Sequence, residues 1–366
     1  MGFSGSLLGD MFREVVMFSY LLTFILAAMF ALIFTPVAIF LAKKWDVLDY
    51  PGDRRVHTVP IPRFGGIAIY FSFWLAVLFS IQFDKMIVGI FLGSTIILIV
   101  GIVDDIKGVR PLYKLAWQLL AAIVLIFFGL AVKQITLPLF DTINLGIIGY
   151  AFAVFWIVGL VNTVNISDGL DGLAAGICFI AALILFWSAY RIGHASASYL
   201  MLALAGAALG FLFYNFHPAK IFMGDSGSMF LGYIIGAVSI WGLLKTATIL
   251  GLVFPLLVLG MPLTDLVFAI IRRSWKGMSI VRADRGHLHH RLLDVGLTQR
   301  QAVLILYAIS FCFGLAAILG VYGNWYIALG LVLLNVGLIL RIMFRRFYLL
   351  KKNDKKKVYI KNRGNE

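Results

Sequence analysis

Apolar residues run along the chain in long stretches, and polar residues gather in short segments between them. The stretches are mostly about 17–25 residues long, the length at which a helix crosses a hydrocarbon core of roughly 30 Å. The pattern predicts eleven membrane-spanning helices, at residues 17–42, 65–82, 86–103, 116–132, 147–164, 173–190, 199–214, 228–244, 248–271, 301–321 and 326–344. We therefore expect an all-α, multi-pass integral membrane protein, with one transmembrane domain over residues 1–344 and a basic tail over 345–366.

Composition and charge support this class. Hydrophobic residues make up 62% of the chain and charged residues 13%, against roughly 45–50% and 25% in soluble proteins. The net charge of +14 does not require a nucleic-acid partner, because 26 of the 31 Lys and Arg residues lie in alternate polar segments or in the C-terminal stretch that begins at Arg341. These segments are 43–64, 104–115, 165–172, 215–227 and 272–300. The positive-inside rule predicts that they are cytosolic, with the N-terminus outside and the C-terminus inside.

Aspartates stand out among these polar segments, since 15 of the 17 acidic residues are Asp. Short carboxylates suit hard cations such as Mg²⁺, which keeps other positions for water and phosphate oxygens. Asp104 and Asp105 close the third predicted span, where the negative end of the helix dipole disfavours each by about 0.3–1 kcal/mol. A cation should therefore lie against them, either a metal or Lys107 or Lys114. An ordinary solvated turn neutralised by those lysines is the alternative.

A second polar motif ends the fifth predicted span. Asn162, Asn165, Asp168 and Asp171 recur at a spacing of three, so they form one polar row in a helix or a 3₁₀ turn. Such a row at the end of a membrane span is costly unless it is paired or binds a ligand. Helix capping followed by a tight turn is the alternative interpretation.

A third motif begins the eighth predicted span. Gly224, Asp225, Ser226 and Gly227 stand at a helix start, where free N–H groups favour an anion. Asp225 beside them favours a metal that bridges to phosphate, and Phe222 offers a flat face for stacking with a base. A plain capping turn would also fit this sequence.

Histidines and arginines make up the remaining polar features. His287, His289, His290 and Arg291 follow Arg282 and Arg285 in the longest predicted inner loop, with no HExxH pattern and no cytosolic cysteine. These neighbours favour a phosphate clamp over a zinc site. The first inner segment contributes further donors, namely Arg54, Arg55, His57 and Arg63, for which topological anchoring is the alternative.

From about Lys43 to Arg291, these motifs in this order resemble the polyprenyl-phosphate N-acetylhexosamine-1-phosphate transferases, glycosyltransferase family 4, which includes MraY, TagO and WecA. The resemblance is greatest to the branch that initiates teichoic acid or O-antigen. It implies transfer of N-acetylglucosamine-1-phosphate from UDP-N-acetylglucosamine to undecaprenyl phosphate, with release of UMP. It also implies Mg²⁺, with Mn²⁺ as a substitute, and a site on the cytosolic face of the bacterial plasma membrane. The sequence is compatible with a homodimer but does not specify one.

The resemblance also implies roles for individual residues. The catalytic residues would be Asp104, Asp105, Asp168 and Asp171, with Asp225 binding the metal and Asp104 or Asp105 assisting. The nucleotide sugar would contact Asn162, Asn165, Asp168, Asn215 and Phe222. Phosphates would be held by Lys114, His287, His289, His290, Arg291 and Arg63. Leu288 interrupts the run of three histidines typical of the peptidoglycan branch, which makes UDP-N-acetylmuramoyl-pentapeptide the less favoured donor.

Two other classes of protein share single features with this chain. Gly224-Asp-Ser226-Gly227 matches the GxSG pattern of intramembrane serine proteases, and Asp265 within an apolar span is typical of a transporter ion path. Neither alternative explains the Asp104–Asp105 pair or the Asn/Asp row.

Overall fold

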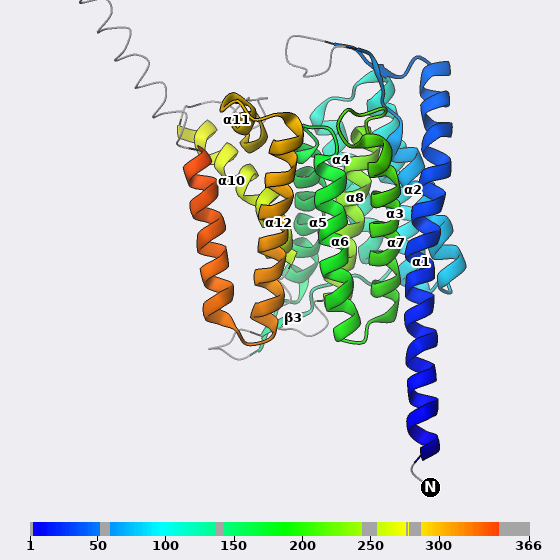
Figure 1. Ribbon diagram of the computed structural model, residues 1–366. Coiled ribbons are helices and arrows are strands. Elements are labelled where there is room, and N and C mark those ends of the chain that lie inside the picture. The colour runs from blue at the N-terminus through cyan, green and yellow to red at the C-terminus, as the bar shows by residue number, and fades with distance from the viewer. Residues whose placement is uncertain are drawn as a thin grey trace, which may run out of the picture.

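The computed structural model describes residues 3–51, 59–136, 142–243, 255–275, 277 and 287–343. Over these residues the chain is almost entirely helical (Figure 1). The helices are α1 (Phe3–Lys44), α2 (Gly65–Ser80), α3 (Lys85–Lys107), α4 (Pro111–Phe127), α5 (Ile147–Ser167), α6 (Leu173–Arg191), α7 (Ala195–Asn215), α8 (Gly224–Val238), α10 (Gly260–Trp275), α11 (Leu288–Asp294) and α12 (Gln299–Val321). A short π-helix, η1 (Ser239–Leu243), continues α8, and a last helix covers Trp325–Met343.

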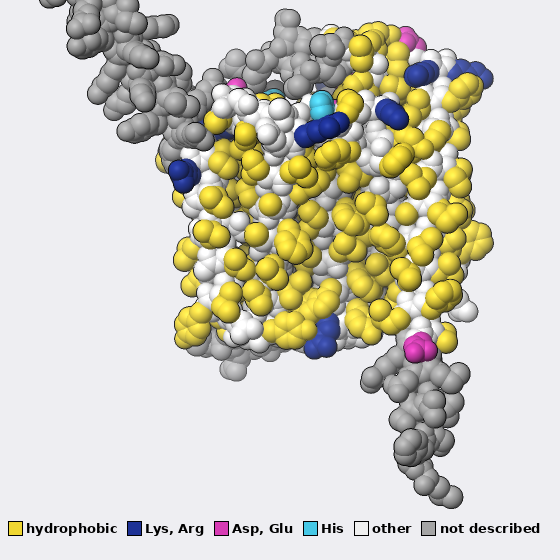
Figure 2. All heavy atoms as spheres, in the orientation of Figure 1, with side chains coloured by type: hydrophobic (Ala, Val, Ile, Leu, Met, Phe, Trp, Pro, Cys, Tyr) yellow, Lys and Arg dark blue, Asp and Glu magenta, His cyan; other side chains and the backbone are white. Residues whose placement is uncertain are grey.

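Seven helical segments in the described chain are long and apolar enough to cross a membrane. They are Glu14–Lys44, Lys85–Lys107, Ile147–Ser167, Leu173–Arg191, Ala195–Asn215, Gln299–Val321 and Trp325–Met343, while α2 and α4 are apolar but shorter. On the face seen in Figure 2, apolar side chains form a broad band across the middle of the molecule. The protein is thus a mostly helical, multi-pass membrane protein, consistent with the all-α class that the sequence predicts; the count of eleven spans and the orientation stay predictions.

Several helix ends differ from the predicted spans. α3 continues to Lys107, so Asp104 and Asp105 lie in its last turn, and α4 begins at Pro111 rather than at 116. Proline is well suited to this first helical position because its missing N–H would have no partner there. The chain also contains two short antiparallel hairpins that the sequence did not predict, β1 (Leu48–Asp49) with β2 (Ile61–Pro62) and β3 (Gln134–Thr136) with β4 (Thr142–Asn144).

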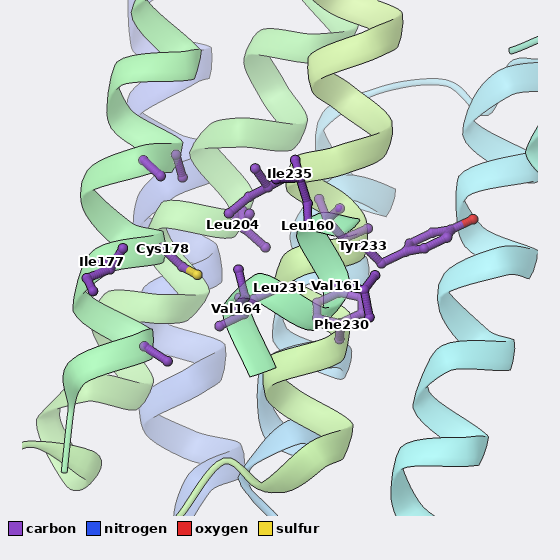
Figure 3. Packing of buried hydrophobic residues seen from close by; sticks show 14 of the residues in the cluster. Leu160, Val161, Val164, Ile177, Cys178, Leu204, Phe230, Leu231, Tyr233 and Ile235 are labelled. Atoms are coloured by element: carbon purple, nitrogen blue, oxygen red, sulfur yellow. The ribbon is translucent and has the colours of Figure 1, made fainter. Parts of the chain in front are cut away.

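Helix α8 lies at the centre of the bundle. Every residue from Ser226 to Val238 is buried, as expected for a helix that is apolar on all sides. It packs against α3, α5 and α2, and Phe230, Leu231 and Ile235 meet side chains of α5 and α7 (Figure 3). The first residues of α8 are therefore placed by contacts along its whole length.

Glycines allow α2, α3 and α8 to approach closely at the end where α8 begins. A Cβ on Gly66 would lie 2.2 Å from the backbone nitrogen of Gly227, and one on Gly101 would lie 2.3 Å from Cα of Ser226. These positions have no room for a side chain, because the atoms in the way are backbone.

We predict that Gly101→Ala lowers stability by about 1–3 kcal/mol, the usual cost of forcing an extra group into a packed core. Thermal unfolding of the purified protein in detergent measures this change. Gly337→Ala is the control, since a Cβ there meets nothing within 4 Å. Equal melting temperatures for the Gly101 variant and the parent protein would contradict the packing described above.

Candidate active site

Four helix ends meet at one end of the bundle, at the top of Figure 1. They are the C-terminal ends of α3 and α5 and the N-terminal ends of α4 and α8. The described parts of the segments predicted to be cytosolic lie at this same end. The structure thus brings together motifs that are separated by more than a hundred residues in the sequence.

Arg63 is brought to this centre by backbone pairing between the segments that precede α2 and α8. The amide of Phe222 donates to Pro62 O at 2.8 Å, and the amides of Gly65 and Gly66 donate to Phe222 O and Met223 O at 3.0 and 2.9 Å. Because Arg63 lies within this paired segment, its guanidinium is held beside the first turn of α8.

Three carboxylates form the core of the site. Asp104, Asp105 and Asp225 each offer an oxygen atom, and these atoms lie within 4.8 Å of one another. Lys114 Nζ lies 3.1 Å from Asp104 Oδ2 and 2.7 Å from Asp225 Oδ2. Arg63 lies 3.1 Å from Asp105 and 2.8 Å from Asp225. The cation expected against Asp104 is therefore Lys114, while Arg63 balances Asp105.

Asp105 also closes the N-terminus of α8. Its Oδ1 accepts the amide of Asp225 at 2.8 Å, and its Oδ2 accepts the amide and hydroxyl of Ser226 at 3.2 and 2.6 Å. The helix start that we expected to bind an anionic ligand thus binds the chain's own carboxylate. The acid at the negative end of α3 faces the positive end of α8, which removes the unfavourable dipole interaction expected from the sequence.

The charges around Asp225 keep it ionised. Burial alone would raise its pKa, but Lys114, Arg63 and the amide of Asn165 lower the pKa of Asp225 to about 2.

The pKa of Asp168 is shifted in the opposite direction. Burial raises the pKa of Asp168 to about 7, and the opposing charge of Arg63 does not overcome this effect. Of these two carboxyl groups, Asp168 is the one that titrates near neutral pH.

The polar row on α5 does not act as one unit. Asn165 donates to Asp225 Oδ2 at 3.1 Å and so joins the carboxylate centre. Asn162 lies one turn deeper, where its amide nitrogen donates to Gln118 Oε1 and Val158 O. Asp171 lies beyond the helix and accepts from the amide of Ala219 at 3.1 Å, with His217 Nδ1 at 2.7 Å.

Asn215 and Asp171 together hold the segment between α7 and α8. Asn215 is buried, accepts the amide of Gly172 and donates to Ile221 O. Helix α12 supports the same region, because Tyr307 Oη donates to Gly172 O at 2.5 Å and Arg300 Nε donates to His217 O at 3.0 Å. In this structure both Asn215 and Asp171 shape the walls of the site; their predicted roles in nucleotide binding and catalysis stay predictions.

The histidine cluster lies against the end of α5. The rings of His287 and His289 stack in parallel with their centroids 5.8 Å apart. The ring centroids of His289 and His290 are 4.3 Å apart. A Cβ on Gly169 would lie 2.4 Å from His289 Nε2, so this glycine makes room for the ring beside Asp168. Burial, with His290 nearby, lowers the pKa of His289 to about 3. His289 is therefore neutral at pH 7 and offers hydrogen bonds rather than positive charge.

Arg291 contacts a different part of the chain from the three histidines. Its guanidinium donates to the backbone carbonyl of Met343, at the end of the last helix. Its predicted contact with phosphate stays a prediction. Arg54, Arg55, His57, Arg282 and Arg285 lie outside the described residues.

Sequence reasoning named Ser226 and Asp265 without placing them in the transferase site, and it gave His217 no role. In the structure Ser226, Asp265 and His217 contact Asp105, His287 and Asp171 respectively. The Gly-Asp-Ser motif that starts α8 and an acid inside an apolar span were visible signals for two of them. The pairing of His217 with Asp171 depends on how the loops fold and had no signal in the sequence.

The chain is similar to proteins that are named as transferases of N-acetylglucosamine phosphate to polyprenyl phosphates. The sequence model of glycosyl transferase family 4 matches residues 87–243. A probable undecaprenyl-phosphate N-acetylglucosaminyl 1-phosphate transferase of Bacillus subtilis is 41% identical over 82% of this chain and 85% of its own length. The chain belongs to this family of polyprenyl-phosphate N-acetylglucosamine-1-phosphate transferases. It is also similar to a decaprenyl-phosphate N-acetylglucosaminephosphotransferase of Mycolicibacterium smegmatis (36% identical, 73% of each chain) and to an undecaprenyl-phosphate alpha-N-acetylglucosaminyl 1-phosphate transferase of Escherichia coli (29%, 78% of each).

For this transferase the serine-protease and transporter interpretations lose their supporting features. The hydroxyl of Ser226 is buried and donates to Asp105, so it is not presented as a nucleophile. Both oxygens of Asp265 have partners, His287 Nδ1 and the amide of Leu288, which account for an acid in this span.

The pKa of Asp168 predicts how turnover of the transferase depends on pH. A carboxyl group with a pKa of about 7 is protonated below that pH, so activity that needs its carboxylate falls about tenfold between pH 8 and pH 6. Initial rates at saturating substrate concentrations measure this decline in activity at low pH. Asp225, with a pKa of about 2, does not contribute to the decline. The decline at low pH should be smaller in Asp168→Asn than in the parent protein; an unchanged decline in that variant would assign the titration to another group.

Proposed function

We propose that this transferase moves N-acetylglucosamine-1-phosphate from UDP-N-acetylglucosamine to undecaprenyl phosphate. The main observation that supports this proposal is the triad of Asp104, Asp105 and Asp225, whose oxygen atoms lie within 4.8 Å of one another. Lys114 and Arg63 flank the triad at one end of an apolar helical bundle. The names of the relatives from Bacillus subtilis and Escherichia coli support the acceptor and the sugar.

In this reaction an oxygen of undecaprenyl phosphate attacks the β-phosphorus of the UDP-sugar. The bond from the β-phosphorus to the oxygen bridging it to the α-phosphorus breaks, and UMP leaves with that oxygen. The products are undecaprenyl-diphospho-N-acetylglucosamine and UMP. Since both reactants are anions, catalysis consists largely of positioning them and compensating their charge.

The structure distinguishes the two aspartates at the end of α3. The Asp105 side chain is 0% exposed, whereas 8% of the Asp104 side chain is exposed. Asp104 is therefore the more accessible to the phosphate of the lipid acceptor, where it would accept a proton or orient the attacking oxygen. These contacts do not decide between direct attack and a covalent aspartyl intermediate.

The carboxylate triad fits a magnesium ion. Three carboxylates from two helices offer oxygen atoms close together, which is the donor type that Mg²⁺ prefers. We propose Asp225 as the principal ligand, with Asp104 or Asp105 as the second. When bound, Mg²⁺ or Mn²⁺ would supply positive charge against the phosphates.

The remaining residues would hold the nucleotide sugar. Lys114 and Arg63 provide fixed positive charge, and the neutral ring of His289 provides a hydrogen bond. Asn165 and Asp168 border the carboxylate centre, and Phe222 would stack on uracil. The paired backbone on both sides of Phe222 fixes its position relative to Asp225.

The proposed site lies on the cytosolic face of the bacterial plasma membrane. This proposal follows from the positive-inside rule, because 26 of the 31 basic residues lie in the segments predicted to be cytosolic or in the C-terminal stretch that begins at Arg341. The product would begin a cell-envelope polymer such as teichoic acid or O-antigen. A different UDP-N-acetylhexosamine, or UDP-N-acetylmuramoyl-pentapeptide, is the alternative donor.

We predict that the purified protein, given Mg²⁺, undecaprenyl phosphate and UDP-N-acetylglucosamine, releases UMP. Chromatography of the nucleotide product measures this, and parallel reactions with other UDP-sugars test the choice of donor. Release of UDP, or no turnover with any UDP-sugar, would refute the proposed reaction.

We also predict that Asp225→Asn reduces Mg²⁺-dependent turnover by about 100-fold or more, because it removes one charge from the centre of the triad. Binding of Mn²⁺, followed by its paramagnetic resonance signal, should weaken in parallel. Asp46→Asn is the matched control, since Asp46 lies in the turn after α1 and accepts a hydrogen bond from Tyr50. Normal metal binding by the Asp225 variant would exclude it as a ligand.

A further inference from the structure

Asp265 is a buried acid that the proposed reaction does not use. It lies in α10, ten residues before the end of the helix, and is 4% exposed. Its Oδ1 accepts the amide of Leu288 at 2.8 Å, and its Oδ2 lies 3.1 Å from His287 Nδ1. One carboxylate therefore holds both the backbone and the ring at the start of the histidine cluster.

Asp265 provides a cap that α11 lacks. His287 is the residue preceding the first turn, and its side chain makes no capping hydrogen bond to that turn. Such a position normally carries Ser, Thr, Asp or Asn, whose oxygen accepts a free amide of the first turn. Here the oxygen comes from another helix, so the start of α11 is tied to α10.

The same carboxylate determines which nitrogen of His287 carries the proton. A carboxylate only accepts hydrogen bonds, so Nδ1 must be the donor in this pair. Nε2 is then the ring atom left for a ligand, as is usual where a carboxylate orients a functional histidine. Asp265 thus controls the chemistry that His287 presents as well as its place.

From His287 the arrangement continues to the carboxylate-lined end of α5. His289 stacks in parallel on His287, and its ring occupies the space left by Gly169, next to Asp168. A shift of His287 would therefore move His289 against the segment between α5 and α6. The contact made inside α10 is in this way transmitted to the wall of the site.

We propose that Asp265 is a positioning residue for the transfer reaction. It fixes the tautomer of His287 and the start of α11, and so seats His287 and His289 against the loop at Gly169. This inference rests on the proposed function for its kinetic readout. It adds a residue outside the segment matched by the family model, which ends at residue 243.

Two substitutions separate the two effects of Asp265. In Asp265→Asn the carbonyl oxygen still accepts the amide of Leu288, but the amide nitrogen faces Nδ1 and favours the opposite tautomer of His287. Asp265→Ala removes the cap as well. We expect both variants to lower kcat by about 100-fold, the typical result of misplacing a catalytic group by about 1 Å. KM for undecaprenyl phosphate should stay unchanged.

Three comparisons test this expectation. The double variant Asp265→Asn, His287→Ala should lose no more activity than His287→Ala alone, because both changes act through one ring. Thr264→Ala is the matched control and should keep normal kcat, since within the described residues Thr264 donates to the carbonyls of Gly260 and Met261 in its own helix. Wild-type kcat in Asp265→Asn, or losses that multiply in the double variant, would overturn the proposal.

Hydrogen–deuterium exchange provides a readout that does not depend on turnover. The amides of residues 288–294 should exchange faster in Asp265→Ala than in Asp265→Asn or the parent protein, with α12 unchanged in all three. If the parent protein transfers no sugar phosphate, the proposed function fails while this comparison still applies. Unchanged exchange of α11 in Asp265→Ala would overturn the positioning role itself.

Discussion

The architecture of this transferase depends on one interaction, the contact of the Asp105 carboxylate with the N-terminus of α8. Two backbone amides, the Ser226 hydroxyl and the Arg63 guanidinium all meet this one group. A buried carboxylate is costly without such donors. The contact joins the negative end of α3 to the positive end of α8. Because Asp105 binds the amide of Asp225, it also places the Asp225 side chain beside Lys114.

The other parts of the centre serve to keep that junction compact. Glycines at positions 66, 101 and 227 bring α2, α3 and α8 together so closely that backbone meets backbone. The paired segments before α2 and α8 then bring Arg63 to the same point. Three carboxylates can lie within 4.8 Å because two fixed cations compensate much of their charge.

The sequence was sufficient for the class of fold and for the motifs that gather at the site. Apolar stretch length predicted the helices, and the aspartates that the sequence singled out at positions 104, 105 and 225 do converge. The binding of Mg²⁺ by these carboxylates stays a prediction. The sequence could not predict which atoms the two neighbouring aspartates would meet, because that depends on the packing of α3 against α8. For the same reason it did not predict that Asn215 and Asp171 would accept backbone amides of the loops at Gly172 and Ala219. The neutral state of His289 likewise follows from burial, which no local pattern shows.

Helix α12 supports the loops of the site, although it lies outside the segment that the family model matches. Tyr307 and Arg300 hold the loops at Gly172 and His217, although both residues lie beyond the segment that the family model matches, which ends at residue 243. Gly176 has no side chain where the ring of Tyr307 passes, so α6 and α12 fit each other closely. The loops of the family segment therefore depend on α12 for two of their contacts, and a fragment that ends at residue 243 would lack both.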